Sequence, residues 1–168
     1  MQLQRQYNVL LIGDSCTDEW AYGSCDRLSP EAPIPVMKFR EHQSAPGMAA
    51  NVYANLKSLG IEVNFLTNRE KIVKTRYVDD RSNQQIMRLD TEPNIKPLHP
   101  SQLTMAAMHS EYDAVVISDY DKGFVGYDII ELLAKQNPNI KIFIDTKKNK
   151  LPIQYNNIIY KINKKEYE

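Results

Sequence analysis

Short apolar runs that end in polar residues constrain the fold of this 168-residue chain more than any other feature of its sequence. Four such runs occur, at residues 9–12, 114–117, 140–144 and 158–162. A short continuous apolar run is typical of a strand buried in a parallel sheet. Helical patterns at residues 49–59 and 127–135 lie between the runs, and Gly60 is placed to end the first helix. Strands that alternate with helices predict an α/β fold, a parallel sheet with helices on its faces.

Polar side chains follow the predicted strands, at the edge where open α/β sheets bind ligands. These residues are Asp14, Asp119, Asp145 and Asn163. In the loop expected after the first run, the carboxylates of Asp14 and Asp18 could accept hydrogen bonds from neighbouring hydroxyls of a sugar. Carboxylates in this position could equally bind a metal ion or cap the next turn, and the residues alone leave these alternatives open.

The segment that opens the first predicted helix, residues 46–51, offers a second place for a ligand. Gly47 allows a ligand to approach the backbone closely, and the start of a helix supplies N–H groups and the positive end of the helix dipole. The segment matches neither the GxxxxGK nor the GxGxxG phosphate-binding pattern. A plain turn into an amphipathic helix is the alternative interpretation.

Residues 71–78 and 84–89 predict a hairpin around residues 79–83. The hairpin carries several cations, among them Arg76 and Arg88, and a guanidinium group matches two phosphate oxygens at once. The alternative is a solvated hairpin at the edge of a sheet, protected from aggregation by its charges.

Composition excludes several classes of partner. Lys and Arg total 21 and Asp and Glu also total 21, so no global basic field attracts nucleic acid. No apolar run approaches the roughly 20 residues of a membrane-spanning helix, and the polar residues 1–8 do not resemble a secretory signal. Cys16 and Cys25 lack the spacing of a metal or redox motif, which predicts reduced thiols and a cytoplasmic location.

A series of sequence blocks, taken together and in order, resembles the ribokinase-like carbohydrate kinases. The blocks are residues 13–18, 27–36, 46–52, 74–76, 83–90, 118–123, 145–147 and 163–166. The block RLSPEAPIPV at residues 27–36 resembles in particular the heptose-7-phosphate kinase domain of the bifunctional ADP-heptose synthesis proteins.

The resemblance implies one kinase-like domain over residues 1–168, a ribokinase-like parallel sheet with a small β lid near residues 34–40 and 71–90. Lid strands in that family commonly mediate dimers, so a homodimer through the lid, or pairing with a partner sugar kinase, is expected. Together with the cations of the hairpin, the resemblance predicts a set of residues that bind a sugar phosphate. They are Asp14, Asp18, Gly47, Asn51, Arg76 and Arg88.

The resemblance also implies Mg-ATP as cofactor. Asn163 and Glu166 match the NxxE motif that organises magnesium and phosphate in the family, with Glu166 as the residue expected at the metal. Family members transfer a phosphoryl group from ATP to a sugar hydroxyl by positioning and charge stabilisation.

Three departures from the family pattern bear on activity. Met48 stands where the family has the second glycine of a pair, and only residues 67–70 replace a further helix and strand. The GAGD motif, which supplies the catalytic base, is absent, so the chain resembles a truncated domain. We expect it to bind a sugar phosphate without transferring a phosphoryl group by itself. Two alternatives remain: a kinase completed by another polypeptide, and an interaction protein that dimerises or pairs with a full-length sugar kinase.

Overall fold

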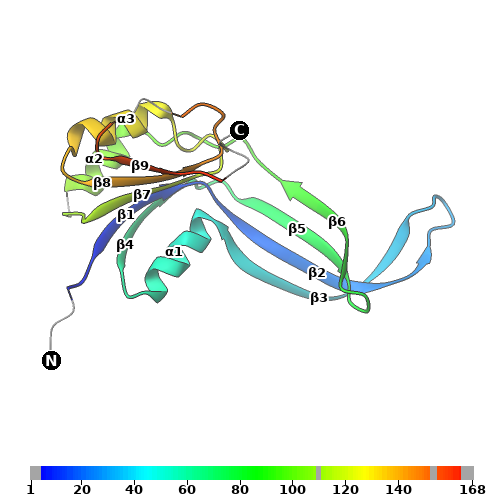
Figure 1. The fold of residues 1–168 in the computed structure, drawn as a ribbon. Coiled ribbons are helices and arrows are strands. Elements are labelled where there is room, and N and C mark those ends of the chain that lie inside the picture. The colour runs from blue at the N-terminus through cyan, green and yellow to red at the C-terminus, as the bar shows by residue number, and fades with distance from the viewer. Residues whose placement is uncertain (1–4, 109–110, 152–154, 164–168) are drawn as a thin grey trace. The chain divides into compact units, whose positions relative to one another are not determined.

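The predicted apolar runs form neighbouring strands of a five-stranded parallel sheet, as the computed structural model shows for residues 5–108, 111–151 and 155–163 (Figure 1). In chain order, the strands are β1 (Asn8–Gly13), β4 (Glu62–Thr67), β7 (Ala114–Asp119), β8 (Lys141–Thr146) and β9 (Ile158–Lys161). Their order across the sheet is β4-β1-β7-β8-β9, and every neighbouring pair is parallel. This arrangement confirms the α/β fold expected from the sequence.

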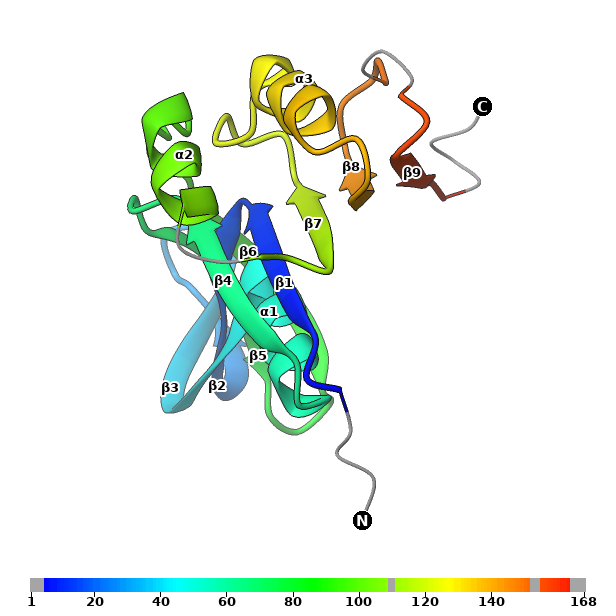
Figure 2. The same cartoon turned by 90° about the vertical axis from the view of Figure 1, so that its left-hand side faces the viewer.

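Three helices accompany the parallel sheet: α1 (Ala49–Ser58), α2 (Pro100–Met108) and α3 (Tyr127–Gln136). Figures 1 and 2 show α2 and α3 over one face of the sheet and α1 against the other. Helix α1 contacts the sheet through Tyr53, whose ring stacks on Phe65 of β4 with 5.2 Å between the ring centroids. Gly60 follows α1 with φ of 76°, as the sequence predicts for the end of that helix. Leu59, the last residue of the predicted helical pattern, lies outside the helix and is 75% exposed, so that end of the prediction is wrong.

Part of the α1 face of the sheet is an open apolar groove of about 310 Å³. Val52 of α1 borders it, and Val116, Phe143 and Ile159 line it from three neighbouring strands. Phe143 is 43% exposed and Ile159 is 44% exposed. Parallel sheets are almost always covered on both faces, so this groove is an unusual feature of the described structure.

The chain divides into two compact units, and the five-stranded sheet belongs to the first, made of Met1–Ser15, Met48–Glu70 and Asn94–Glu168. The second unit comprises Cys16–Gly47 and Lys71–Pro93, and it contains both predicted lid segments. Its sheet has the order β3-β2-β5-β6. The strands are β2 (Ser15–Leu28), β3 (Pro35–Met48), β5 (Ile72–Asp79) and β6 (Gln84–Thr91).

The predicted hairpin is confirmed as the antiparallel pair β5 and β6, and the buried Asp79 holds its turn. The Asp79 carboxylate accepts hydrogen bonds from the Ser82 hydroxyl at 2.7 Å, the Ser82 amide at 3.1 Å and the Cys25 amide at 3.1 Å. The Ser82 hydroxyl bond, followed by the Cys25 amide bond, lowers the pKa of Asp79. The turn therefore depends on an ionised carboxylate.

Two expectations about the strands of the second unit need correction. Residues 14–18 were expected as a loop, but β2 begins at Ser15 and continues for 14 residues. The segment expected in the lid at residues 34–40 overlaps β3, which continues to Met48, so α1 begins only at Ala49. Strands β2 and β3 are mostly half-buried or exposed, and for that reason they lack the continuous apolar runs that identify the strands of the first unit.

Candidate functional site

An ion pair between Asp18 and Arg76 forms the centre of the candidate site in the second unit. Asp18 Oδ1 accepts a hydrogen bond from Arg76 Nη1 at 2.7 Å, with side chains 22% and 25% exposed. Strands β2 and β5 bring the two residues together, because Trp20 pairs with Arg76 in the register of the two strands. The Arg76 guanidinium lies over the Trp20 ring, 5.3 Å from its centroid. The pair remains accessible while its cation is held in place by an aromatic ring.

Gly47 packs directly against this carboxylate. A Cβ atom at position 47 would lie 2.2 Å from Asp18 Oδ2 and 2.5 Å from Cys16 Sγ. Only a glycine leaves room for the Asp18 carboxylate beside the backbone of β3. The structure thus brings together three of the predicted site residues, Asp18, Gly47 and Arg76.

Cys16 is a member of this cluster that the sequence did not indicate. It lies two residues before Asp18 in β2, and its Sγ is 4.0 Å from Asp18 Oδ2. Burial of the thiol, followed by the nearby Asp18 charge, raises the pKa of Cys16 to about 11. Side chains of a strand alternate between its two faces, so a strand predicted at this position would have placed residues 16 and 18 on the same face.

Alkylation of Cys16 is expected to be slow in the folded protein. At pH 8 a thiol with a pKa of about 11 is about 0.1% thiolate, so iodoacetamide should react at least ~100-fold more slowly than with an ordinary cysteine. The rate should rise about tenfold for each pH unit up to pH 10. Mass spectrometry of a Cys25→Ser variant follows Cys16 alone, and the same variant in urea provides the unfolded control. Equal rates in buffer and in urea would contradict the buried, high-pKa thiol.

In the first unit, Asp14 organises the loop that follows β7. Its carboxylate is fully buried and accepts backbone hydrogen bonds from Tyr120 at 2.8 Å, Phe124 at 3.2 Å and Lys122 at 3.3 Å. Burial raises the pKa of Asp14, although the three backbone bonds act in the opposite direction. Both carboxylate oxygens are engaged with the loop, so the structure gives Asp14 a positioning role, and its contact with a sugar remains a prediction.

A second buried cluster lies at the carboxyl ends of β7 and β8. Lys148 Nζ is 3.0 Å from Asp119 Oδ2 and 2.9 Å from Asp121 Oδ1, and its side chain is only 9% exposed. The Thr146 hydroxyl donates to Asp119 Oδ2 at 2.7 Å. Burial lowers the pKa of Lys148, but hydrogen bonds to Asp121 and Asp119 outweigh it and leave that pKa raised. The sequence showed the acidic residue at the strand end but not its partner Lys148.

The other predicted site residues are Asn51, Arg88, Asn163 and Glu166. Asn51 is exposed in the first turn of α1. Arg88 is opposite Arg76 across β5 and β6, but its guanidinium binds Asp90 at 2.8 and 2.9 Å. Asn163 is exposed, and Glu166 lies outside the described residues. No described group of three or more His, Cys, Asp or Glu side chains could hold a metal ion.

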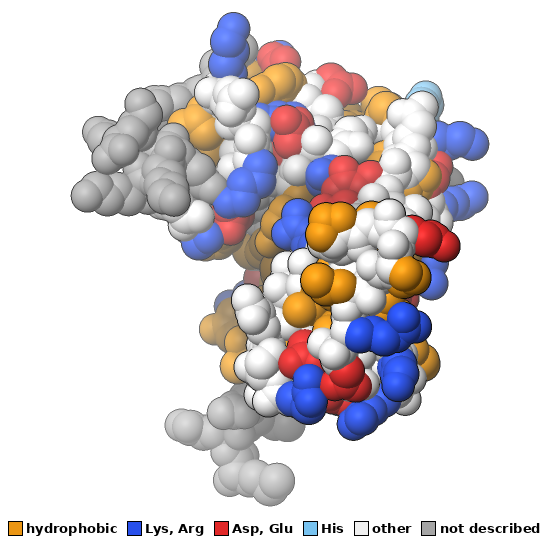
Figure 3. Space-filling model, turned by 90° about the vertical axis from the view of Figure 1, so that its right-hand side faces the viewer, with side chains coloured by type: hydrophobic (Ala, Val, Ile, Leu, Met, Phe, Trp, Pro, Cys, Tyr) orange, Lys and Arg blue, Asp and Glu red, His pale blue; other side chains and the backbone are white. Residues whose placement is uncertain are grey.

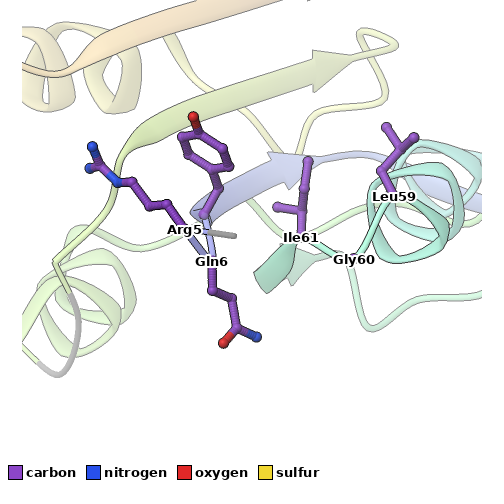
Figure 4. A pocket seen from close by; sticks show the side chains of 6 residues that line it. Arg5, Gln6, Leu59, Gly60 and Ile61 are labelled. Carbon is purple, nitrogen blue, oxygen red and sulfur yellow. The ribbon is translucent and has the colours of Figure 1, made fainter. Parts of the chain in front are cut away.

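Figure 4 shows a cavity of about 540 Å³ at the amino end of β1. It lies between Arg5, Gln6 and Tyr7 on one side and the turn at residues 59–61 on the other, with the Arg5 guanidinium 5.5 Å from the Tyr7 ring centroid. This end of a parallel sheet is opposite the edge where ligands bind, so we assign it no role in the candidate site.

On the face shown in Figure 3, acidic and basic side chains lie beside one another and are interspersed with hydrophobic ones. No helix in the part of the chain that the structure describes is long and apolar enough to cross a membrane.

Comparison with known proteins identifies relatives of the chain, although no protein-family model matches it. The bifunctional protein HldE of Campylobacter jejuni subsp. doylei is 35% identical over 171 residues, which cover 86% of this chain and 37% of that protein. HldE of Vibrio vulnificus strain YJ016 is 32% identical over 169 residues, 83% of this chain and 35% of that protein. The chain therefore spans little more than a third of the length of these relatives.

Solved structures share the fold at low sequence identity. A carbohydrate kinase from Agrobacterium tumefaciens superposes with a TM-score of 0.52 at 13% identity, covering 83% of this chain and 53% of that one. Ribokinase from Giardia lamblia gives 0.51 at 14% identity, covering 90% of this chain and 57% of that one. The sequence resemblance is confirmed: the chain has the ribokinase-like fold of carbohydrate kinases and is similar in sequence to the bifunctional HldE proteins.

Proposed function

We propose that this carbohydrate-kinase-like chain binds a sugar phosphate of the heptose type. The observation that carries the proposal is the Asp18 carboxylate, held between Gly47 and Arg76 in a partly exposed position. Its Oδ1 atom is occupied by Arg76, whereas Oδ2 meets only the weak thiol donor of Cys16 among the described residues. A carboxylate oriented in this way can accept a hydrogen bond from a sugar hydroxyl, and charged hydrogen bonds of this kind are strong.

The proposal concerns binding and not phosphoryl transfer. Asn163 and Glu166 are the residues predicted to organise Mg-ATP, and Glu166 lies outside the described residues. The sequence contains six glycines, and no GAGD motif is among them. We therefore expect the sugar phosphate to bind in the absence of nucleotide.

Isothermal titration of the purified chain with heptose 7-phosphate, with and without Mg-ATP, tests this function. Heat of binding for the sugar phosphate alone is the expected result. Absence of binding under both conditions would overturn the proposal. Binding of both ligands with release of ADP would replace it with a working kinase.

The open groove on the five-stranded sheet favours a second candidate, an interaction protein that pairs with a full-length sugar kinase. Val116, Phe143 and Ile159 present an apolar strip that water would contact in an isolated chain. Covering such a strip contributes about 25 cal/mol for each Å² of apolar surface removed from water.

A Phe143→Lys variant tests this second candidate by light scattering after size-exclusion chromatography. The wild-type chain should co-elute with HldE of Campylobacter jejuni, and the variant should elute separately, because a charge in the groove opposes burial. Leu59→Lys is the control, since Leu59 is an exposed apolar residue outside the groove. Separate elution of the wild-type chain from the kinase would exclude this candidate.

A further inference from the structure

A second polar cavity, of about 460 Å³, lies in the first unit at the carboxyl end of β4. Its floor includes the buried Phe124 and its basic side chains are Arg69, Lys96 and His99. The other lining residues are Thr67, Glu70, Pro97, Ser101 and Gln102. With His99 neutral, two cations and one carboxylate give the lining a formal charge of +1.

The backbone around Arg69 is rigidly held. The neighbouring Asn68 is buried, and its side-chain oxygen accepts a hydrogen bond from the Ser15 amide at 2.7 Å. Its side-chain nitrogen donates to the carbonyl oxygens of Glu70 at 2.6 Å and Ser15 at 3.2 Å. Asn68 thus holds the backbone on both sides of Arg69, whose side chain is exposed beside the cavity.

The backbone of the segment that carries Lys96 is anchored in a similar way. It lies between Ile95 and Leu98, which are 7% and 3% exposed and anchor the segment in the core. The Leu98 amide donates to the Phe124 carbonyl at 2.8 Å. The Phe124 amide in turn donates to Asp14, which connects this cavity to the loop after β7.

Both cations lack the carboxylate partner that most arginines of this chain have. Within the described residues, neither Arg69 nor Lys96 forms an ion pair, whereas the other arginines pair with nearby aspartates in five cases. These pairs are Arg5–Asp113, Arg40–Asp80, Arg76–Asp18, Arg81–Asp26 and Arg88–Asp90. These two exposed cations form no ion pair in the part of the chain that the structure describes, so they are available to an anion from solution.

The helix that begins beside the cavity does not supply this attraction. In α2, the Gln102 amide donates to the His99 carbonyl at 2.9 Å, and the Ser101 amide donates to His99 Nδ1 at 3.2 Å. The Gln102 side-chain oxygen accepts from the His99 amide at 3.1 Å. Binding must therefore come mainly from the side chains of Arg69 and Lys96, which reach the cavity from two separate segments.

We propose that this cavity binds a phosphate monoester dianion through Arg69 and Lys96. The guanidinium matches two phosphate oxygens, and the ammonium supplies a point charge on the other side. The Ser101 hydroxyl and the side-chain amide nitrogen of Gln102 are further donors among the lining residues. The site shares no residue with the Asp18 cluster, so the inference goes beyond sugar binding and does not depend on it. The phosphoryl group of a sugar phosphate or of a nucleotide fits this chemistry.

Inorganic phosphate, titrated into the purified chain at constant ionic strength, is the first probe. We expect saturable binding, with amide shifts of residues 69, 96, 101 and 102 in a ¹H–¹⁵N correlation spectrum, and a loss of at least ~10-fold in affinity for Arg69→Gln. Arg27→Gln is the matched control, because Arg27 is exposed and, within the described residues, forms no ion pair. It should bind phosphate as the wild-type chain does. Absence of binding, or equal loss in both variants, would overturn the proposal.

Competition separates the sources of the phosphate. If heptose 7-phosphate displaces inorganic phosphate and ATP does not, the site serves the sugar phosphate, and the reverse assigns it to the nucleotide. An Asp18→Ala variant keeps the two proposals distinguishable, since it should retain inorganic phosphate binding even where sugar binding fails. Loss of phosphate binding in Asp18→Ala would contradict a separate site.

Discussion

A Gly13→Ala variant is expected to unfold at a far lower urea concentration than the wild-type chain. The added Cβ would lie 2.1 Å from the Ser118 carbonyl oxygen and 2.9 Å from Ala49 Cβ. The first of these atoms belongs to the backbone of β7, which pairs directly with β1, so it cannot move without separating the strands. Overpacking of a well-packed interior typically costs 1–3 kcal/mol, and a clash with a fixed backbone should cost about 3 kcal/mol or more.

Circular dichroism at 222 nm during urea titration measures this loss. Gly60→Asn is the control, because a Cβ at Gly60 would meet nothing within 4 Å and asparagine tolerates the positive φ there. That variant should lie within about 1 kcal/mol of the wild-type chain. A Gly13→Ala midpoint equal to that of the control would show that the sheet adapts to the extra methyl group.

An Asp18→Ala variant should lose the affinity of the chain for heptose 7-phosphate while its fold remains. Removal of one charged hydrogen-bonding partner costs about 1.5–3 kcal/mol, or about 10- to 150-fold in the dissociation constant. Gly47→Ala should cause a similar loss by a different route, because its methyl group would displace Asp18 Oδ2 from its present position. Isothermal titration measures both constants.

Asp26→Ala provides the matched control for these two variants. Asp26 lies on the same strand, β2, and forms an ion pair with Arg81 at 2.8 Å, but it is outside the candidate site. It should bind the sugar phosphate as the wild-type chain does. An unchanged affinity in Asp18→Ala, with wild-type circular dichroism, would show that the sugar is held elsewhere.

The sequence predicts the first unit well because its strands are buried. Residues 9–12 and 114–117 are continuous apolar runs, and both are central strands of the parallel sheet. In the second unit the same approach fails, since β2 and β3 carry polar residues and bury little of their length. The blocks that resembled a kinase family identified the fold where the hydrophobic pattern could not.

The sequence predicted which residues belong to the candidate site but not how they are arranged in space. Asp18 and Arg76 are 58 positions apart, and only the register of β2 against β5 brings them into contact.

Met48 shows a similar limit: it stands where the family has glycine and adopts φ of 54°, a conformation that costs a non-glycine residue about 1–3 kcal/mol. The substitution is visible in the sequence, but its cost in conformational free energy follows only from the backbone conformation.

The order of strands in the parallel sheet has a consequence for how the chain folds. Strand β1 precedes the other strands of the sheet in the chain. Its neighbour β4 follows at Glu62–Thr67, but its other neighbour β7 begins only at Ala114, and the Tyr120 amide reaches Asp14 across 106 positions. Both segments of the second unit are synthesised in that interval. Pairings of such long range form slowly and leave apolar strands exposed to aggregation. During translation, residues 9–12 can therefore pair with β4 well before β7 is made, but the other edge of β1 stays unpaired until then.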